Sequence, residues 1–180
     1  MIKKIYRFLY KKIMVKVNHV KYARKIGVNM AGEIHLYGNI GWGTEPWLIT
    51  LGHDVYITNG VRFITHDGGT LLFRKQCPDL EITKPIVVGD NVYIGNNVLL
   101  LPGVTIGNNV VIGAGAVVSR DIPDNSVAVG VPARVIKTAE EYLEKIKKES
   151  IHLGHLKGKE KDIALKMHYG YKGKSKGIYY

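Results

Sequence analysis

Residues 88–123 read VGDNVY-IGNNVL-LLPGVT-IGNNVV-IGAGAV-VSRDIP, one six-residue unit repeated six times without a break. An aliphatic residue opens every unit. Because residues two apart in a strand point to the same side, Val92 and Ile94 face one way and Tyr93 faces the other. We expect Gly95 to turn the corner, with backbone angles that a Cβ would obstruct. A short fixed period predicts a coiled, stacked architecture.

Three flat sides of six residues each make one triangular coil of about 18 residues, and the coils stack on one another. This period places Ile94 beneath Ile112 and Leu100 beneath Val118. No coil can bury its own apolar interior, so only stacking closes the core. A helical interpretation fails because Gly returns at the turns of the pattern.

The pattern also occurs upstream, in LGHDVY, ITNGVR and FITHDG over residues 51–68. Leu51 and Val88 are 37 residues apart, one more than two full coils, so the phase slips between them. We expect the irregular stretch 67–84 to form a loop extruded from the coil. Between residues 26 and 50 the pattern indicates one or two imperfect coils.

Length and composition favour one domain with terminal additions: a basic helix over 1–25, the coil over 26–136, and a helix with a basic tail over 137–180. The net charge of +11 comes from the two ends, because residues 26–136 hold six basic and nine acidic residues. A nucleic-acid partner is therefore not expected. The single cysteine, Cys77, fits a reducing compartment, and we expect neither an export signal nor a spanning helix, since there is no apolar run of about 18 residues. These features predict a cytoplasmic protein.

Both terminal segments have helical signals. Ile2, Ile5, Leu9 and Ile13 have helical spacing among nine basic residues. Such a helix either lies on an anionic membrane surface or covers the end of the coil stack, and we favour the second alternative. Near the other end, residues 138–141 have the spacing of a capping box and predict a helix through about Lys148.

Four motifs resemble those of the hexapeptide-repeat acyltransferases: IGNNV from residue 94, LPGVTIG from 101, VIGAGAVV from 111 and GVPARVI from 130. The chain is most similar to the maltose, galactoside and nodulation branch and to the O-acetyltransferases of capsule and lipopolysaccharide assembly. This resemblance implies a left-handed parallel β-helix. It also implies a homotrimer that binds acetyl-CoA between subunits, needs no metal, and transfers the acetyl group directly to a saccharide.

The resemblance assigns the catalytic base to His66, at the start of the extruded loop. An imidazole titrates near neutral pH and is suited to remove a proton from an acceptor hydroxyl. Asp67 either orients this imidazole, as carboxylates do for catalytic histidines, or shapes the turn before Gly68. The sequence leaves these two roles equally open.

The acceptor site is expected in the imperfect coils. Related sugar acetyltransferases carry an acidic residue near the position of Glu45, and Asn39 matches an asparagine of the family's site after a one-residue gap. Trp42 and Trp47 either stack on a sugar ring or cap an irregular coil.

Acetyl-CoA is expected along the C-terminal coils. Gly113 and Ala114 leave the backbone open to an extended pantetheine, and Ala114 is predicted to point outward. The resemblance adds polar contacts to the pantetheine and the phosphates. They come from Tyr93, Asn96, Ser119, Arg120, Arg134 and Lys137, although relatives often have Trp at position 93 and a small hydroxyl residue at 96.

The sequence also bears on several other functions. A zinc centre of the γ-carbonic anhydrase type needs further histidines beside the loop, and none follows His66 before His152. A serine acetyltransferase has a large helical N-terminal domain, and a basic segment of 25 residues does not supply one. N-acetylation of an aminosugar nucleotide and a non-enzymatic scaffold stay open. The sequence favours O-acetylation of a sugar hydroxyl in the synthesis of a surface polysaccharide.

Overall fold

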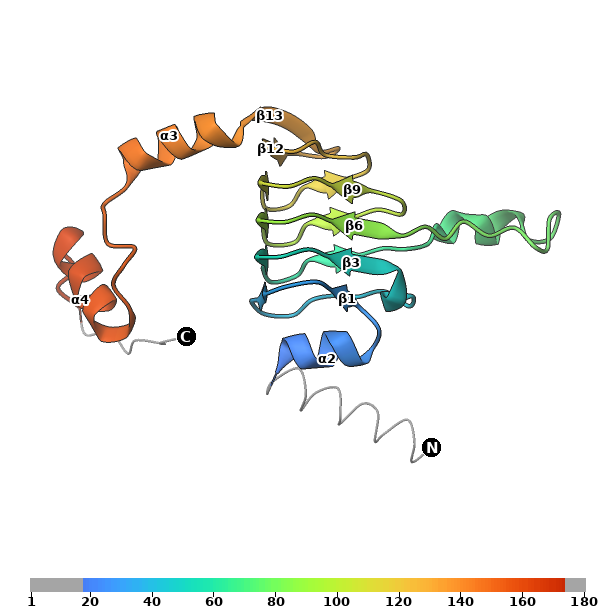
Figure 1. Cartoon of the computed structure of the whole chain (residues 1–180), viewed down its shortest axis with the longest axis horizontal. Coiled ribbons are helices and arrows are strands. Elements are labelled where there is room, and N and C mark those ends of the chain that lie inside the picture. The colour runs from blue at the N-terminus through green and yellow to red at the C-terminus, as the bar shows by residue number, and fades with distance from the viewer. Residues whose placement is uncertain (1–17, 174–180) are drawn as a thin grey trace. The chain divides into compact units, whose positions relative to one another are not determined.

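The computed structural model describes residues 18–173, and its centre is a stack of coils with three faces (Figure 1). Successive coils place short strands on the three faces, and within each face these strands pair in parallel up to β12. The first face contains β1 (Asn29–Met30), β3 (Ile49–Leu51), β6 (Ile86–Val88) and β9 (Thr105–Ile106). The second contains β2 (Ile34–Leu36), β4 (Val55–Ile57), β7 (Val92–Ile94), β10 (Val110–Ile112), β12 (Ser126–Val129) and β13 (Arg134–Thr138), and the third contains β5 (Arg62–Phe63), β8 (Leu99–Leu100) and β11 (Val117–Val118).

The strand register confirms the 18-residue coil. Ile112 pairs with Ile94, and Val118 pairs with Leu100, as the repeat predicted. The stack ends at β13, which pairs antiparallel with β12. This reversal lets the chain leave the stack after one more strand.

The core is a column of aliphatic side chains inside the coil. Val92 and Ile94 are fully buried while Tyr93 points outward, as the alternation in the sequence requires. At the corner that follows, Asn97 and not Gly95 has the left-handed backbone angle, with φ of 59°. Gly95 is needed for a different reason, because a Cβ there would lie 2.6 Å from the backbone nitrogen of Ala114 on the next coil. The glycine thus permits close stacking.

The predicted loop is present, and the strand register shows that it takes the place of a whole coil. Leu51 pairs directly with Val88, so the spacing of 37 positions comprises one 18-residue coil and 19 inserted residues. The inserted segment contains the short 3-10 helix η2 (Gly68–Phe73) and extends away from the stack before β6 (Figure 1). At its base, the backbone nitrogen of Asp67 donates to the carbonyl of Ile82, and that of Lys84 donates to Thr65.

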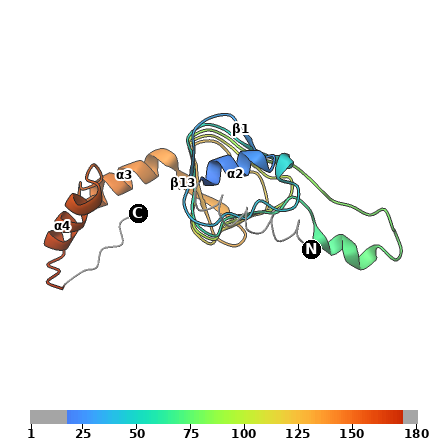
Figure 2. The ribbon, with the colours of Figure 1, turned by 90° about the horizontal axis from the view of Figure 1, so that it is seen from below.

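Helix α2 (His19–Lys25) covers the first coil, lying across the open end of the stack (Figure 2). Ala23 is fully buried, and Val20 and Tyr22 pack against the core. Asn18 caps the helix by accepting a hydrogen bond of 2.8 Å from the backbone nitrogen of Lys21. The end-covering role is therefore confirmed for these residues. The rest of the predicted basic helix lies outside the described residues.

The chain divides into two compact units, residues 1–140 and 141–180. Helix α3 (Ala139–Glu149) lies where the sequence predicted a helix. Helix α4 (Gly158–His168) was not predicted, because its apolar residues are sparse among lysines and glycines. Within residues 18–173, no helix has the length and apolar character that crossing a bilayer requires.

Candidate active site

The imidazole of His66 lies against a carboxylate from the preceding coil. Glu45 directly precedes the 3-10 helix η1 (Pro46–Leu48), and its Oε2 lies 2.9 Å from Nδ1 of His66. His66 follows β5, at the base of the inserted segment. The side chain of Glu45 is 24% exposed and that of His66 is 41% exposed, so the ring is open to solvent while the carboxylate is mostly covered.

Two threonines complete this arrangement. Thr65, which is fully buried, donates from Oγ1 to Oε2 of Glu45 at 2.6 Å, and Oγ1 of Thr44 lies 3.3 Å from Nδ1 of His66. Hydrogen bonds from the side chains of Thr44, Thr65 and His66 lower the pKa of Glu45 to about 2. The carboxylate is therefore ionised at neutral pH.

An ionised Glu45 determines which nitrogen of the imidazole carries the proton. The carboxylate can only accept, so Nδ1 of His66 is the donor and Nε2 keeps its lone pair. An imidazole held in this tautomer is a general base with one free nitrogen.

Asp67 has the turn-forming role of the two that the sequence left open. Its Oδ1 accepts from the backbone nitrogen of Gly69 at 2.8 Å, which caps η2. The carboxylate that contacts His66 belongs to Glu45 instead. Asp67 therefore does not orient the imidazole, and the residue that contacts the ring, Glu45, belongs to the neighbouring coil.

The two tryptophans have different positions. Trp42 is only 7% exposed and stacks on Phe63, with ring centroids 5.1 Å apart and planes 15° from parallel. It fills the imperfect coil from inside, so of the two alternatives the structure has the packing role, and Trp42 is not placed to stack on a sugar as the substrate-binding assignment required. Trp47 is 59% exposed and stays available for such a contact.

A groove of about 360 Å³ crosses the third face near the base of the inserted segment. At one side lie Asn39, Gly60 and Asn97, in the corner where each coil enters this face; we call this the entry corner. At the other side lie Gly43 and Ile64, where the coils leave the face; we call this the exit corner. Arg62 and other β5 residues lie between them.

The exit corner leads directly to the Glu45–His66 pair. Gly43 is followed by Thr44 and Glu45, while Ile64 is followed by Thr65 and His66. The two coils that line this side of the groove therefore also supply the two partners of the pair.

Comparison with known proteins identifies the family of this chain. A family model described as bacterial transferase hexapeptide (six repeats) matches residues 85–120. Protein CapG of Staphylococcus aureus is 43% identical over 159 residues, which cover 87% of this chain and 92% of that protein. The galactoside O-acetyltransferase of Escherichia coli (strain K12) is 52% identical over 93 residues, 52% of this chain and 45% of that protein. A maltose O-acetyltransferase structure from Clostridium difficile 630 has a TM-score of 0.52 and 33% identity, covering 64% of this chain and 72% of that one.

The chain belongs to the hexapeptide-repeat acyltransferases. The similarity to CapG extends over most of both chains, well beyond the repeat itself. As a member of this family, the chain is an acyltransferase, as the sequence predicted.

Part of the predicted donor-binding set of this acyltransferase lies along the entry corner and the adjoining second face. The backbone nitrogen of Gly115 donates to the carbonyl of Asn96 at 2.7 Å, so consecutive coils bring these corner residues together. Ala114 is exposed and Gly113 is half-buried, in agreement with an open backbone. The neighbouring second face carries Tyr93, Arg134 and Lys137, of which Lys137 is half-buried and the other two are exposed.

Ser119 and Arg120 are separated from that set within one chain. They follow β11 and are both exposed, so they lie at the exit corner, on the same side of the third face as His66. The single chain therefore presents the predicted donor residues as two groups, one at each side of the third face.

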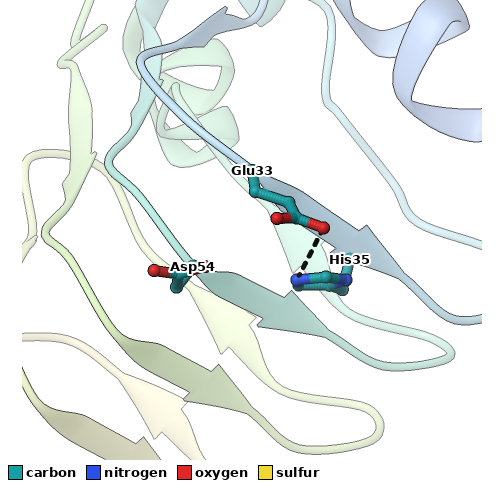
Figure 3. A group of neighbouring side chains, drawn as sticks. All are labelled: Glu33, His35 and Asp54. Atoms are coloured by element: carbon teal, nitrogen blue, oxygen red, sulfur yellow. Dashed lines mark ion pairs between the residues drawn. The ribbon is translucent and has the colours of Figure 1, made fainter.

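Within residues 18–173, one group of three potential metal ligands lies close together: Glu33, His35 and Asp54 (Figure 3). The Glu33 and His35 side chains are 3.7 Å apart, and His35 stacks on Tyr56. The group lies beside β2 and β4 of the second face, and both of its carboxylates are exposed. Exposed acidic side chains often gather without an ion, and we assign no metal to this group.

Sequence reasoning missed the two threonines and Arg62. One signal for Thr65 was available, because Val61, Phe63 and Thr65 continue an inward alternation in which only the last is polar. A buried hydroxyl requires a partner, and here that partner is Glu45. Thr44 and Arg62 carried no comparable signal.

Proposed function

We propose that this chain is an acetyl-CoA-dependent O-acetyltransferase that acts on a sugar hydroxyl during synthesis of a surface polysaccharide. The observation that carries the proposal is the Glu45–His66 pair, whose two residues follow Gly43 and Ile64 of the groove by two positions in the chain. The similarity to a galactoside O-acetyltransferase and to a maltose O-acetyltransferase supports the acceptor class.

The chemistry follows from the orientation of the ring. Nε2 of His66 takes the proton of the acceptor hydroxyl as its oxygen attacks the thioester carbonyl of acetyl-CoA. The ionised Glu45 stabilises the imidazolium that forms. A backbone amide stabilises the oxyanion of the tetrahedral intermediate. The carbon–sulfur bond then breaks, and the imidazolium returns the proton to the CoA thiolate.

We assign the donor to the two groups of predicted residues at the sides of the third face. In a left-handed coil that assembles as a homotrimer, the entry corner of one subunit would face the exit corner of its neighbour. Acetyl-CoA then lies along Asn96 and Ala114 of one chain and near Ser119 of the next. The phosphates are expected to contact Arg120 or Arg134, because guanidinium groups bind phosphate oxygens well. We expect the reaction to take place in the cytoplasm.

A transfer assay tests the function directly. Purified protein is incubated with acetyl-CoA and a panel of monosaccharides, nucleotide sugars and oligosaccharides, and free CoA thiol and the acetylated product are both measured. We expect O-acetylated sugar from the native chain and a decrease of about 10²- to 10⁴-fold in kcat for His66→Ala. Since the ring is partly exposed, this variant should retain its fold and its affinity for CoA.

Asp67→Asn is the matched control, because Asp67 is adjacent in sequence but caps η2. It should keep kcat within a few-fold of the native value. Full activity in His66→Ala, or CoA binding without transfer to any acceptor by the native chain, would remove the support for this function.

A further inference from the structure

Arg62 is the charged residue that lines the groove on the third face. It occupies the outward position of β5, while its neighbour Phe63 points into the core. Its backbone nitrogen donates to the carbonyl of Val98 at 2.9 Å, so the strand holds its base in place. The guanidinium group is thus carried on a regular strand, not on a mobile loop.

The residues above and below Arg62 carry no charge. In the register of the third face, Arg62 lies between Gly41 on one side and Leu99 on the other, and Val117 follows Leu99. Neighbouring strands often place an acidic residue opposite an arginine, but this column has none. The guanidinium makes no hydrogen bond or ion pair with any residue of the range 18–173, although five N–H groups are available.

Gly41 leaves room for the arginine stem. A Cβ at this position would lie 3.2 Å from Cγ of Arg62, closer than side chains usually approach. The absence of a side chain at Gly41 and at Gly43 also opens the floor of the groove. The local sequence therefore combines a hollow surface with one cation that has no internal partner.

Arg62 and the candidate base belong to the same coil. Arg62 precedes His66 by four residues on the same coil, and Asn39 and Asn97 provide polar groups at the entry corner. A sugar lying in the groove can place a hydroxyl at the imidazole and a second group at Arg62. Guanidinium groups bind carboxylates and phosphates through paired hydrogen bonds.

We propose that the acceptor is an anionic saccharide and that Arg62 binds its carboxylate or phosphate group. The proposal rests on the O-acetyltransferase function and deepens it by naming the charge of the substrate. A uronic acid would supply a carboxylate, and a nucleotide- or lipid-linked sugar would supply a phosphate. In both cases Arg62 selects the acceptor and takes no part in proton transfer.

The test compares matched acceptors and matched variants. Steady-state kinetics are measured with neutral hexoses, the corresponding hexuronates, and the corresponding nucleotide diphosphate sugars. We expect native enzyme to prefer an anionic class, and Arg62→Gln to raise the KM for that class about 10- to 100-fold, which corresponds to the loss of a hydrogen-bonded charge pair. The KM for acetyl-CoA should stay within about twofold. The class affected distinguishes a carboxylate from a phosphate ligand.

Two further variants test the shape of the cation at position 62 and the effect of removing a positive charge elsewhere. Arg62→Lys keeps the charge without the planar fork and should give an intermediate KM. Lys75→Gln removes one positive charge from the inserted segment, outside the groove, and should leave all three acceptor classes unchanged. Light scattering measures whether any variant alters the oligomeric state.

The possible outcomes separate this proposal from the function on which it rests. Efficient acetylation of neutral hexoses that is insensitive to Arg62→Gln would overturn the anionic acceptor and leave the O-acetyltransferase intact. A rise in the KM for acetyl-CoA would overturn it as well, by placing Arg62 at the donor. Dissociation of the oligomer in Arg62→Gln would assign the residue to an interface instead. Absence of transfer to every sugar would overturn both proposals.

Discussion

The coils of residues 86–129 and the coils of residues 29–66 share the same three faces. The first group follows the six-residue repeat closely, and the second departs from it. In the first group, stacking uses the inward positions, and the corners carry glycines and asparagines. In the second group, Trp42 replaces an aliphatic residue inside, Gly41 and Gly43 hollow the outer surface, and 19 residues are inserted after His66. The candidate site lies in the second group, where the repeat is broken.

The difference has a physical reason. A buried aliphatic pair in register is sufficient to join two coils, so the outward side chains are free to vary without loss of the stack. The Glu45–His66 pair uses that freedom, because its two residues come from adjacent coils held in register by the core beneath them. Changes in the two regions should therefore affect different properties.

The largest effect is expected in the regular coils. Ile94 is fully buried and pairs with Ile57 and Ile112, so Ile94→Ala should lower the free energy of unfolding by about 2–5 kcal/mol. The kcat of the folded enzyme should be unchanged. Val87→Ala, at an outward position, is the control and should change stability by less than about 0.5 kcal/mol. Denaturant titration would contradict the comparison if both variants lost the same stability.

The next effect is on turnover, in the irregular coils. Glu45→Gln keeps the shape of the side chain but removes the charge that holds Nδ1–H of His66, and kcat should fall about 10- to 100-fold. Glu81→Gln removes a carboxylate that pairs with Arg74 on the inserted segment and should leave kcat unchanged. Equal kinetics in the two variants would show that the Glu45 charge is not used.

A smaller effect is expected on donor affinity. Arg134 is exposed on β13, and a contact between this side chain and a CoA phosphate is expected to contribute about 1 kcal/mol. Arg134→Ala should therefore weaken CoA binding about fivefold without changing acceptor binding. Calorimetric titration with CoA alone measures this change. Arg74→Ala is the control, and an unchanged affinity in Arg134→Ala would move the phosphate site elsewhere.

The smallest effect is on the pH dependence of stability. The pKa of Glu45 is lowered in the folded chain to about 2 from an ordinary value of 4.5, so its stabilising contribution is complete above pH 4.5 and is lost as pH falls toward 2. Thr65→Val removes one of the hydrogen bonds that lower this pKa, so the stability lost below pH 4.5 should be smaller in this variant and the loss should end at a higher pH.

Melting temperatures between pH 2 and pH 6 measure this shift. Thr58→Val is the control, because Oγ1 of Thr58 donates to the uncharged carbonyl of Ile94. It should lower the melting temperature by a similar amount at every pH. A parallel response in both variants would mean that Thr65 does not act through Glu45.

The sequence predicted the regular coils well because their period is expressed in every unit. The partners Ile94–Ile112 and Leu100–Val118 followed from counting alone. The length of the insertion did not, because 37 residues are compatible with two coils or with one coil and a loop. Only the pairing of Leu51 with Val88 distinguishes these alternatives.

The candidate site was predicted by residue type but not by partner. His66 and Glu45 were both selected, but the sequence could not tell whether Asp67, the carboxylate next to His66, contacts the ring or caps the turn. Contacts between coils join residues about 20 positions apart, and no local pattern reports them. Trp42 shows the same limit, since its burial depends on Phe63 of the next coil.

A double-mutant cycle of His66→Ala and Glu45→Gln tests most directly whether the two side chains act as one unit. The kcat of the two single variants and of the double variant is measured with acetyl-CoA and the preferred acceptor. If the carboxylate acts only through the imidazole, the double variant should have the kcat of His66→Ala, with no further loss. If the two decreases multiply, Glu45 acts independently of His66, and the carboxylate does not serve the reaction by orienting the imidazole.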